Sequence, residues 1–294
     1  MEPKTRLVMK ASGLTARLRL AFRTGPRLRR WLRELAATPD AANHADCARL
    51  QRLAARRVLA EFRVRLRIRP PSASTSERLR SQPHIVIALH EGIADVPCLM
   101  SLPVPLRFVA RSEIFRWPLV GPVLARMGHI ECDPESPLAG WRRLQQEVPK
   151  AVASGHSVAM FPQGTLLGIE SAFRCGAFRL AQRFSLPLLP VVLTGTHRIW
   201  EHPFGSTIRY DQRVAMHVLD SVWIPGGRRD AAEDACRNLQ QRMKALALAS
   251  GDAPPRRYVP QRDGYWDGFA FDIDPQFRAL WQDIHLRRRQ QART

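Results

Sequence analysis

One histidine and one carboxylate in the first half of the sequence have the spacing of an acid–base pair. His90 follows the apolar run 84–89, and Asp95 comes five residues later. A histidine at the end of a strand can accept a proton from a substrate hydroxyl, and a nearby carboxylate can orient its ring and select its tautomer. Taken alone, the spacing is equally typical of an ordinary polar strand end, so the surrounding segments must decide between the two interpretations.

The segments around this pair alternate between short apolar runs and amphipathic stretches, which predicts an α/β fold. The expected architecture is a mixed, largely parallel sheet flanked by helices, with amphipathic helices at the N-terminus and functional loops at the strand ends. Apolar and basic residues alternate strictly over 62–68, which predicts a half-buried edge strand, and the Pro and Ser/Thr residues of 70–76 predict a loop. Further strands are expected over 84–89, 106–110, 128–132, 156–161, 188–194 and 209–219, and helices over 12–37, 41–59, 136–155, 177–184 and 231–249.

Composition divides the 294 residues into three expected parts. Residues 1–60 form a helical, membrane-docking segment, 61–250 the enzymatic domain, and 251–294 a C-terminal appendage. Within the first part, the apolar residues of 12–37 recur at helical spacing with arginines between them. Such a helix can lie in a membrane interface, or it can pack on the core with a solvated basic face, and amphipathicity alone does not distinguish these.

Charge is the strongest feature of the composition. The chain has 46 Lys and Arg against 26 Asp and Glu, a formal net charge of +20. Such an excess attracts polyanions, whether nucleic acid, anionic lipid or phosphorylated substrates, although a general bias toward arginine would have the same appearance. No uncharged stretch approaches the roughly 20 apolar residues of a membrane-spanning helix. Five cysteines occur singly and predict a reducing compartment: Cys47, Cys98, Cys132, Cys175 and Cys236. Of these, Cys98, Cys132 and Cys175 are expected to be buried, inert thiols rather than nucleophiles.

Four sequence blocks occur in a fixed order around and after the pair. They are HEGIADVP at 90–97, LRFVARSEIFRWPLVGPVLARMGHIECD at 106–133, VAMFPQGTLLGIESAFRCGAFR at 158–179 and LPLLPVVLTG at 186–195. Together they resemble the signature blocks of the lysophosphatidic acid acyltransferase-like family of glycerolipid acyltransferases, with its HxxxxD motif. The resemblance covers residues 62–220.

This resemblance implies an O-acyltransferase that moves a fatty acyl group from acyl-CoA or acyl-ACP to the hydroxyl of a lysophospholipid or related lipid-like acceptor. His90 would be the general base, Asp95 would orient it, and backbone N–H groups around Gly164 and Thr165 would stabilise the oxyanion. No metal and no resident cofactor are implied, because the thioester is a co-substrate. The remaining substrate-binding positions would be Arg111, Glu113, Phe161, Pro162, Gln163, Gly164, Thr165 and Arg174.

The expected partners are the acyl thioester donor, which includes an acyl carrier protein as one alternative, the lipid-like acceptor and an anionic membrane. No specific nucleic acid is expected, because no helix-turn-helix, zinc finger or RNA-binding signature occurs. The chain is therefore expected in the cytoplasm, peripheral at the inner face of the membrane. A zinc protease is excluded because Ala94 stands where His-Glu-x-x-His needs its second histidine, and a Gly-x-Ser-x-Gly elbow is missing.

Several positions depart from the family pattern and leave the acceptor open. Leu166 and Pro134 stand where two arginines usually occur, and loss of these cations should weaken recognition of an acceptor phosphate. An acceptor without phosphate, from a secondary lipid or natural-product pathway, is one alternative. A basic membrane- or nucleic-acid-binding protein without catalysis is another, although retention of both His90 and Asp95 argues against it. The other departures are Leu89 for Asn, Gly92 for Ser, Gln163 for Glu and Arg111 for Lys.

Overall fold

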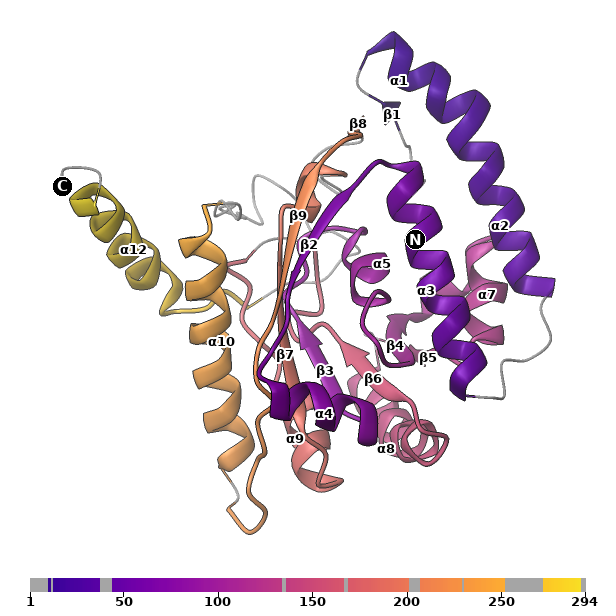
Figure 1. Ribbon diagram of the computed structural model, residues 1–294. Helices are drawn as coiled ribbons and strands as arrows, with labels where there is room; N and C mark the ends of the chain where they lie inside the picture. Colours follow the sequence, from indigo (N-terminus) through magenta and orange to yellow (C-terminus); the bar gives the residue numbers. More distant parts are fainter. Residues whose placement is uncertain are drawn as a thin grey trace.

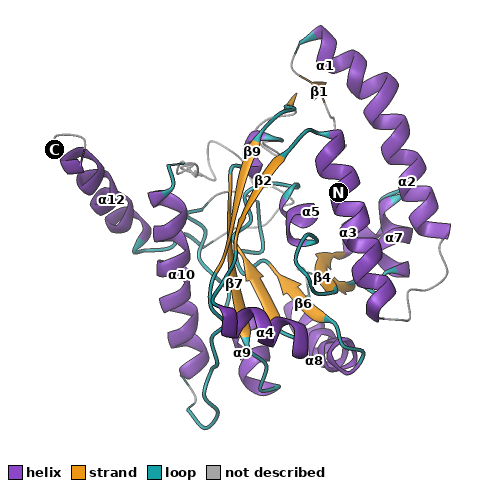
Figure 2. Cartoon of the chain, viewed as in Figure 1, coloured by secondary structure: helices purple, strands orange, loops and turns teal. Residues whose placement is uncertain are grey.

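The computed structural model describes residues 10–11, 13–37, 44–133, 136–166, 169–200, 207–228, 230–251 and 272–291. Its centre is a seven-stranded sheet with the order β2-β9-β7-β3-β6-β4-β5 (Figures 1 and 2). The five strands from β7 to β5 are parallel, whereas β2 and β9 pair in parallel with each other and run antiparallel to the rest. The strands are β2 (Arg65–Arg69), β3 (Ile85–Ala88), β4 (Leu106–Arg111), β5 (Ile130–Cys132), β6 (Ser157–Met160), β7 (Leu188–Thr194) and β9 (Arg213–Val218).

Helices cover both faces of this sheet. On one face α8 (Pro137–Ala153), α9 (Gly176–Arg183) and α10 (Ala231–Ala249) pack on the strands, with α12 (Phe277–Gln291) against α10. On the other face lie α3 (His44–Glu61), α4 (Ala73–Ser81) and α5 (Asp95–Leu99). The prediction of a mixed, largely parallel sheet flanked by helices is thus confirmed. The remaining short elements are α6 (Ser112–Phe115), α7 (Val120–Arg126), η2 (Thr196–Arg198) and the parallel pair β1 (Lys10–Ala11) and β8 (Thr207–Ile208).

Strand β3 lies at the centre of the core, which explains its uninterrupted apolar sequence. Ile85 and Ile87 contribute to the hydrophobic cluster on the α8–α10 face, and Val86 and Ala88 to the cluster on the opposite face. All four residues are completely buried. A parallel strand covered on both faces needs apolar side chains at every position, rather than at every second one. The buried strand therefore gives a rigid support to His90, which lies just beyond its end.

Strand β2 lies at the edge of the sheet, as its alternating arginines predicted. The loop predicted over 70–76 is wrong from residue 73 onward, because α4 begins there. Ser72 caps this helix by accepting a hydrogen bond from the Thr75 N–H at 3.3 Å. Serine is a common residue in loops and is also a preferred N-cap, so the Ser/Thr run was compatible with either structure.

The N-terminal amphipathic segment forms one continuous helical stretch with two different environments. It comprises α1 (Leu14–Arg19), a π-helical turn (Leu20–Thr24) and α2 (Gly25–Ala37). Leu32, Leu35 and Ala36 of α2 pack against a small cluster that includes α7. By contrast, the first half of the stretch leaves three large apolar side chains exposed at i, i+4, i+8 spacing: Leu14, Leu18 and Phe22.

Thr24 fastens this stretch to the body of the protein. Its hydroxyl donates to Glu61 Oε1 at 2.9 Å and accepts from the Tyr210 hydroxyl at 3.0 Å. Arg27 adds an ion pair with Glu61 at 3.0 Å. Among the helices of the described residues, none combines the length and apolar character that crossing a bilayer requires.

Candidate active site

The predicted histidine–carboxylate pair exists in the structure. His90 is the second residue after β3, and its ring Nδ1 lies 2.7 Å from Oδ2 of Asp95, the first residue of α5. The Asp95 side chain is completely buried, whereas 17% of the His90 side chain is exposed. The carboxylate is therefore shielded from solvent, while the imidazole is partly exposed to solvent. A base that acts on an external substrate requires this arrangement.

Hydrogen-bond chemistry determines which ring nitrogen of His90 is available to accept a proton. An ionised carboxylate can only accept hydrogen bonds, so Nδ1 must carry the proton that is shared with Asp95. The neutral imidazole then has its lone pair on Nε2. Nε2 is thus the nitrogen that can take a proton from a hydroxyl, and Asp95 stabilises the imidazolium that results.

The same carboxylate oxygen also holds the loop between β3 and α5. Asp95 Oδ2 accepts hydrogen bonds from the backbone N–H groups of Glu91 at 2.7 Å and Gly92 at 2.9 Å. With His90 Nδ1, one buried oxygen therefore has three donors. Hydrogen bonds to a charged group are stronger than neutral ones, so this set compensates the burial of the carboxylate and limits the movement of the imidazole.

The third sequence block packs against the other side of His90. The Phe161 ring stacks on the imidazole with centroids 3.7 Å apart and planes 11° apart. The buried Gln163 accepts a hydrogen bond from the His90 backbone N–H through Oε1 at 2.7 Å. An uncharged amide oxygen can make this bond as well as a carboxylate can, so the replacement of the family's Glu by Gln163 preserves the support of His90.

The turn after β6 brings Gly164 and Arg174 together. Gly164 has a φ of 66°, and its N–H donates to Phe161 O at 2.9 Å. Because that N–H is already used, Gly164 does not offer it to an oxyanion in this conformation, contrary to the expected arrangement. Arg174 donates its backbone N–H to Pro162 O at 2.8 Å, and its guanidinium lies beside Gly164. Thr165 is buried in the same turn.

Arg111 is the last residue of β4, which is separated from β3 by β6, and Glu113 follows in α6. Adjacent strands are about 4.8 Å apart, so this position is roughly 10 Å along the sheet edge from the strand that carries His90. Arg111 Nη1 and Glu113 Oε2 are 3.7 Å apart, with 18% and 42% of their side chains exposed. Leu166 is buried, and Pro134, the other departure from the family pattern, lies outside the described residues.

A second histidine–carboxylate contact, between His197 and Glu91, was not predicted from the sequence. Glu91 Oε2 lies 3.2 Å from His197 Nδ1 and accepts a hydrogen bond from the Gly195 N–H at 3.2 Å. Burial raises the pKa of Glu91, while His197 opposes that rise. This contact joins the His90 loop to the end of β7. Its one sequence signal was a Glu next to His90, which has no periodicity that could identify a partner about 100 residues away.

The thiol near the pair is a structural group. Cys98 is completely buried on α5, and burial, with the nearby Asp95 charge, raises its pKa. A thiol is a weak nucleophile unless its thiolate is favoured. Cys98 therefore fills the core, as the sequence predicted, whereas Cys132 and Cys175, which were also expected to be buried, are partly exposed.

The region that contains most of the four sequence blocks is similar to a known protein family. Residues 71–194, which include His90, Asp95 and the 161–166 turn, match the family model described as Acyltransferase. The chain is 30% identical over 162 residues to the 1-acyl-sn-glycerol-3-phosphate acyltransferase BAT2, chloroplastic, of Brassica napus, covering 53% of this chain and 45% of that protein. The chain thus spans less than half the length of that relative.

Two bacterial relatives are covered more completely. A Bacillus subtilis 1-acyl-sn-glycerol-3-phosphate acyltransferase is 28% identical, with 55% of this chain and 80% of that protein aligned. A Pseudomonas aeruginosa lyso-ornithine lipid O-acyltransferase is 27% identical over 59% of this chain and 70% of its own length. The fold is similar to that of PlsC, the 1-acyl-sn-glycerophosphate acyltransferase of Thermotoga maritima, with a TM-score of 0.58 at 15% identity, covering 71% of this chain and 81% of that one.

Proposed function

We propose that the protein transfers a fatty acyl group from a thioester to the hydroxyl of a lysophospholipid or related lipid-like acceptor. The proposal rests on residues 71–194, which match the Acyltransferase family model. The observation that carries this proposal is the 2.7 Å contact between His90 Nδ1 and the buried Asp95 carboxylate, with the histidine accessible to solvent. In the described part of the chain, the His90 ring hydrogen-bonds to Asp95 and to no serine, threonine or cysteine, which supports a base that activates the hydroxyl of a bound acceptor.

The proposed reaction has one chemical intermediate. His90 Nε2 removes the proton of the acceptor hydroxyl as its oxygen attacks the thioester carbonyl. The resulting tetrahedral oxyanion collapses, the carbon–sulfur bond breaks, and the leaving thiolate takes the proton from the imidazolium. Asp95 holds the correct tautomer throughout and stabilises the transient positive charge on the ring. Backbone N–H groups of the 161–166 turn other than that of Gly164 are the proposed oxyanion donors.

Two features leave the kind of acceptor to experiment. Leu166 and Pro134 replace the two arginines that the family pattern places near an acceptor phosphate. Arg174 beside Gly164, and Arg111 at the end of β4, are the cations that we propose for a phosphate or carboxylate on the acceptor. The names of the relatives include both a glycerol phosphate and a lyso-ornithine lipid acceptor, so similarity alone supports either chemistry.

We further propose that the enzyme works at a membrane surface. The exposed Leu14, Leu18 and Phe22 form an apolar ridge on the first half of the N-terminal helical stretch, flanked by arginines. Apolar side chains beside cations suit insertion into the headgroup region of an anionic bilayer. A lipid-like acceptor would then reach the active site without passing through water.

The experiment that tests the reaction incubates purified protein with labelled acyl-CoA and acyl-ACP and a panel of lysophospholipid and phosphate-free acceptors. We expect acyl transfer with at least one donor and acceptor. His90→Ala should lower kcat by about 10²- to 10⁴-fold, the usual contribution of a general base. Asp95→Asn should cause a loss of the same order, because an amide can donate to Nδ1 and so favour the wrong tautomer.

The matched control is Asp211→Asn, which neutralises a half-exposed carboxylate paired with Arg63 on the surface. It should leave kcat unchanged. Thermal unfolding of all variants shows whether each remains folded. A folded His90→Ala variant with wild-type transfer rates would disprove the proposed mechanism.

A further inference from the structure

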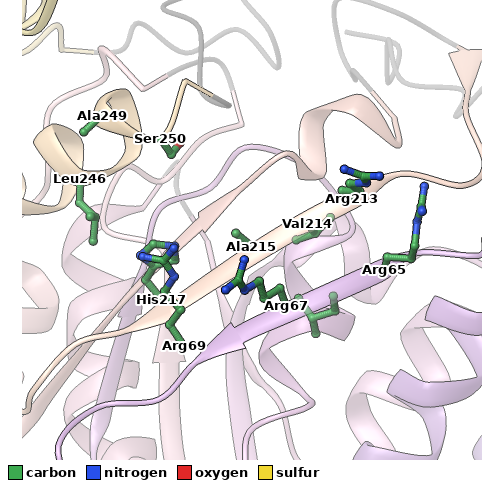
Figure 3. A pocket seen from close by; sticks show the side chains of 11 residues that line it. Arg65, Arg67, Arg69, Arg213, Val214, Ala215, His217, Leu246, Ala249 and Ser250 are labelled. Atoms are coloured by element: carbon green, nitrogen blue, oxygen red, sulfur yellow. The ribbon is translucent and has the colours of Figure 1, made fainter. Parts of the chain in front are cut away.

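A basic cavity lies apart from the histidine–carboxylate pair, along strands β2 and β9 and beside the C-terminal end of α10 (Figure 3). Its volume is about 630 Å³, within the range of roughly 300–1,000 Å³ that is usual for small-molecule sites. No carboxylate belongs to its lining among the residues that the structure describes. We call it the arginine groove, after its ionisable lining residues Arg65, Arg67, Arg69, Arg213 and His217.

Strand register explains why these side chains share one face. Arg65 pairs with Arg213 and Arg69 pairs with His217, and the cross-strand partner of Arg67 is Ala215. Paired residues point to the same side of a sheet, while the intervening residues point to the other side. In Figure 3 the basic side chains accordingly extend along the two strands. Like charges directly opposite each other destabilise a sheet, so this arrangement has an energetic cost.

Protection of an exposed sheet edge does not account for the whole groove. Basic side chains on β2 discourage pairing with another chain, because β2 is the edge strand. Arg213 and His217, however, belong to β9, which is paired on both sides by β2 and β7. An interior strand needs no such protection. In addition, Leu246 and Ala249 of α10 form an apolar wall, which a purely repulsive edge would not require.

The charges of the groove are not neutralised within the described part of the protein. Arg67, Arg69 and Arg213 form no ion pair with any described residue, and Arg65 donates to the backbone carbonyl of Asp211 at 3.3 Å. Elsewhere on the surface, arginines such as Arg179 and Arg237 do pair with carboxylates. Burial, together with the charges of Arg69 and Arg67, also lowers the pKa of His217. The groove thus retains a positive potential that an anion could neutralise.

We propose that the arginine groove binds a soluble organic molecule of the nucleotide class that carries two or more phosphate groups. Guanidinium groups form paired, charge-assisted hydrogen bonds with phosphate oxygens. Arg65, Arg67 and Arg69 alternate along β2, so their attachment points are roughly 6.8 Å apart and suit separate phosphates. The wall of Leu246 and Ala249 offers apolar contact for the organic part of the ligand.

One end of the groove reaches the side of the sheet that carries the histidine–carboxylate pair. Gly195, the residue after β7, lies so close to β9 that a Cβ on it would be 2.6 Å from Arg213 O. Its N–H donates to the side chain of Glu91, next to His90. If the proposed acyl transfer is correct, coenzyme A is one ligand whose nucleotide part would bind in the groove. Only this extension rests on the proposed function, since binding itself needs no catalysis.

The test measures binding by calorimetry with the full-length His90→Ala protein, which separates binding from turnover. The probes are ADP, ATP, coenzyme A, inorganic diphosphate, an acyl carrier protein, a 20-nucleotide RNA and phosphatidylglycerol vesicles. We expect saturable binding of the nucleotides that weakens with added salt. The double variant Arg67→Gln/Arg69→Gln should weaken it at least about tenfold, because two charge-assisted contacts are lost. Arg67→Lys/Arg69→Lys, which keeps the charge, should give an intermediate affinity.

The matched control is Arg56→Gln/Arg80→Gln, which removes the same charge from exposed positions on α3 and α4 outside the groove. This control should bind as the parent protein does. The proposal is overturned if none of the soluble nucleotides binds, or if the two double variants weaken binding equally. It is also overturned if only RNA, carrier protein or vesicles bind. In the active enzyme, the groove variant should raise the KM for acyl-CoA and leave that for acyl-pantetheine unchanged, which tests the extension separately.

Discussion

Gly92 shows how closely the loop between His90 and Asp95 is packed. A Cβ at this position would lie 2.9 Å from backbone atoms of Thr196. The Gly92 N–H also donates to the Asp95 carboxylate, so the close approach and the anchoring of Asp95 depend on the same few atoms. The family pattern has a serine here, and in this chain there is no room for one unless η2 moves away.

We therefore expect Gly92→Ala to lower kcat by about tenfold or more, since an error of 1 Å in a catalytic geometry can cost as much as 10²-fold. Gly226→Ala is the matched control, because nothing lies within 4 Å of a Cβ at that position. Steady-state kinetics and thermal unfolding of both variants check the prediction. Equal kcat values for the two variants would show that the loop accommodates the methyl group.

The half-buried His129 is expected to make the stability of the fold depend on pH. Burial, with smaller contributions from Arg107 and His156, lowers the pKa of His129 to about 4. Its Nδ1 accepts a hydrogen bond from the Phe108 N–H at 3.0 Å, a contact that the neutral ring makes. Because the unfolded state has the higher pKa, near 6.5, it binds more protons between pH 6.5 and pH 4, and stability falls as the pH falls through this window.

The expected loss from His129 is about 3 kcal/mol at pH 4 relative to pH 7. His129→Gln keeps an acceptor for Phe108 and has no titratable ring, so its unfolding free energy should decline less over the same range. Urea unfolding of both proteins at several pH values between 4 and 7.5 measures the difference. Identical pH dependence in the two proteins would contradict the assignment to this ring.

The C-terminal segment is attached to residues 170–171, which follow the 161–166 turn. Lys244 of α10 is completely buried and donates to Asp274 Oδ2 and to Ser171 O, each at 2.9 Å. Asp274 donates its backbone N–H to Glu170 O at 2.9 Å. Burial lowers the pKa of Lys244, and Asp274 opposes that shift. The appendage thus supports the segment that leads to Arg174.

Loss of the carboxylate should leave a buried ammonium group without its partner. Asp274→Ala is therefore expected to cost about 3 kcal/mol or more of stability. The control is Glu147→Ala, which breaks a more exposed ion pair with Lys150 and should cost about 1 kcal/mol or less. Chemical denaturation of both variants gives the comparison. Similar losses in both would mean that burial does not strengthen the dependence of Lys244 on Asp274.

At the scale of the whole molecule, the N-terminal helical stretch extends past the sheet, and its first half carries the exposed apolar ridge (Figure 1). The net charge of +20 favours approach to an anionic surface, and the ridge supplies the apolar contact that charge alone cannot. Leu32, Leu35 and Ala36 in the second half of this stretch pack on the protein, whereas Leu14, Leu18 and Phe22 in the first half are exposed. The assignment of residues 1–60 to membrane docking remains a prediction.

Phe22→Glu should reduce binding to phosphatidylglycerol vesicles by about tenfold, because it replaces an apolar side chain of the ridge with a negative charge. Leu138→Glu is the matched control, since Leu138 is 75% exposed on α8, comparable to the 79% of Phe22. Vesicle sedimentation at two salt concentrations measures both variants. If both bind vesicles equally well, the ridge is not the membrane contact.

Most elements of the sheet and the contact between His90 and Asp95 could be predicted from the sequence. Strands such as β3 and β7 are buried on both faces, so their positions appear as continuous apolar runs, and α10 was predicted with its observed bounds. His90 and Asp95 are five residues apart, and a local contact of this kind depends on one loop. Residues 73–81 and 277–291 were harder to predict, because short or polar helices have weak periodicity and obtain their stability from packing.

Contacts that depend on strand order could not be predicted from the sequence. Gln163 supports His90, Glu91 binds His197, and Lys244 binds Asp274, each across more than 25 residues of sequence. The arginine groove likewise exists because β2 pairs in parallel with β9, which places two distant basic segments on one face. Periodicity specifies which side of an element is buried, but it does not specify which strands become neighbours. That choice depends on the packing of the complete sheet and its helices.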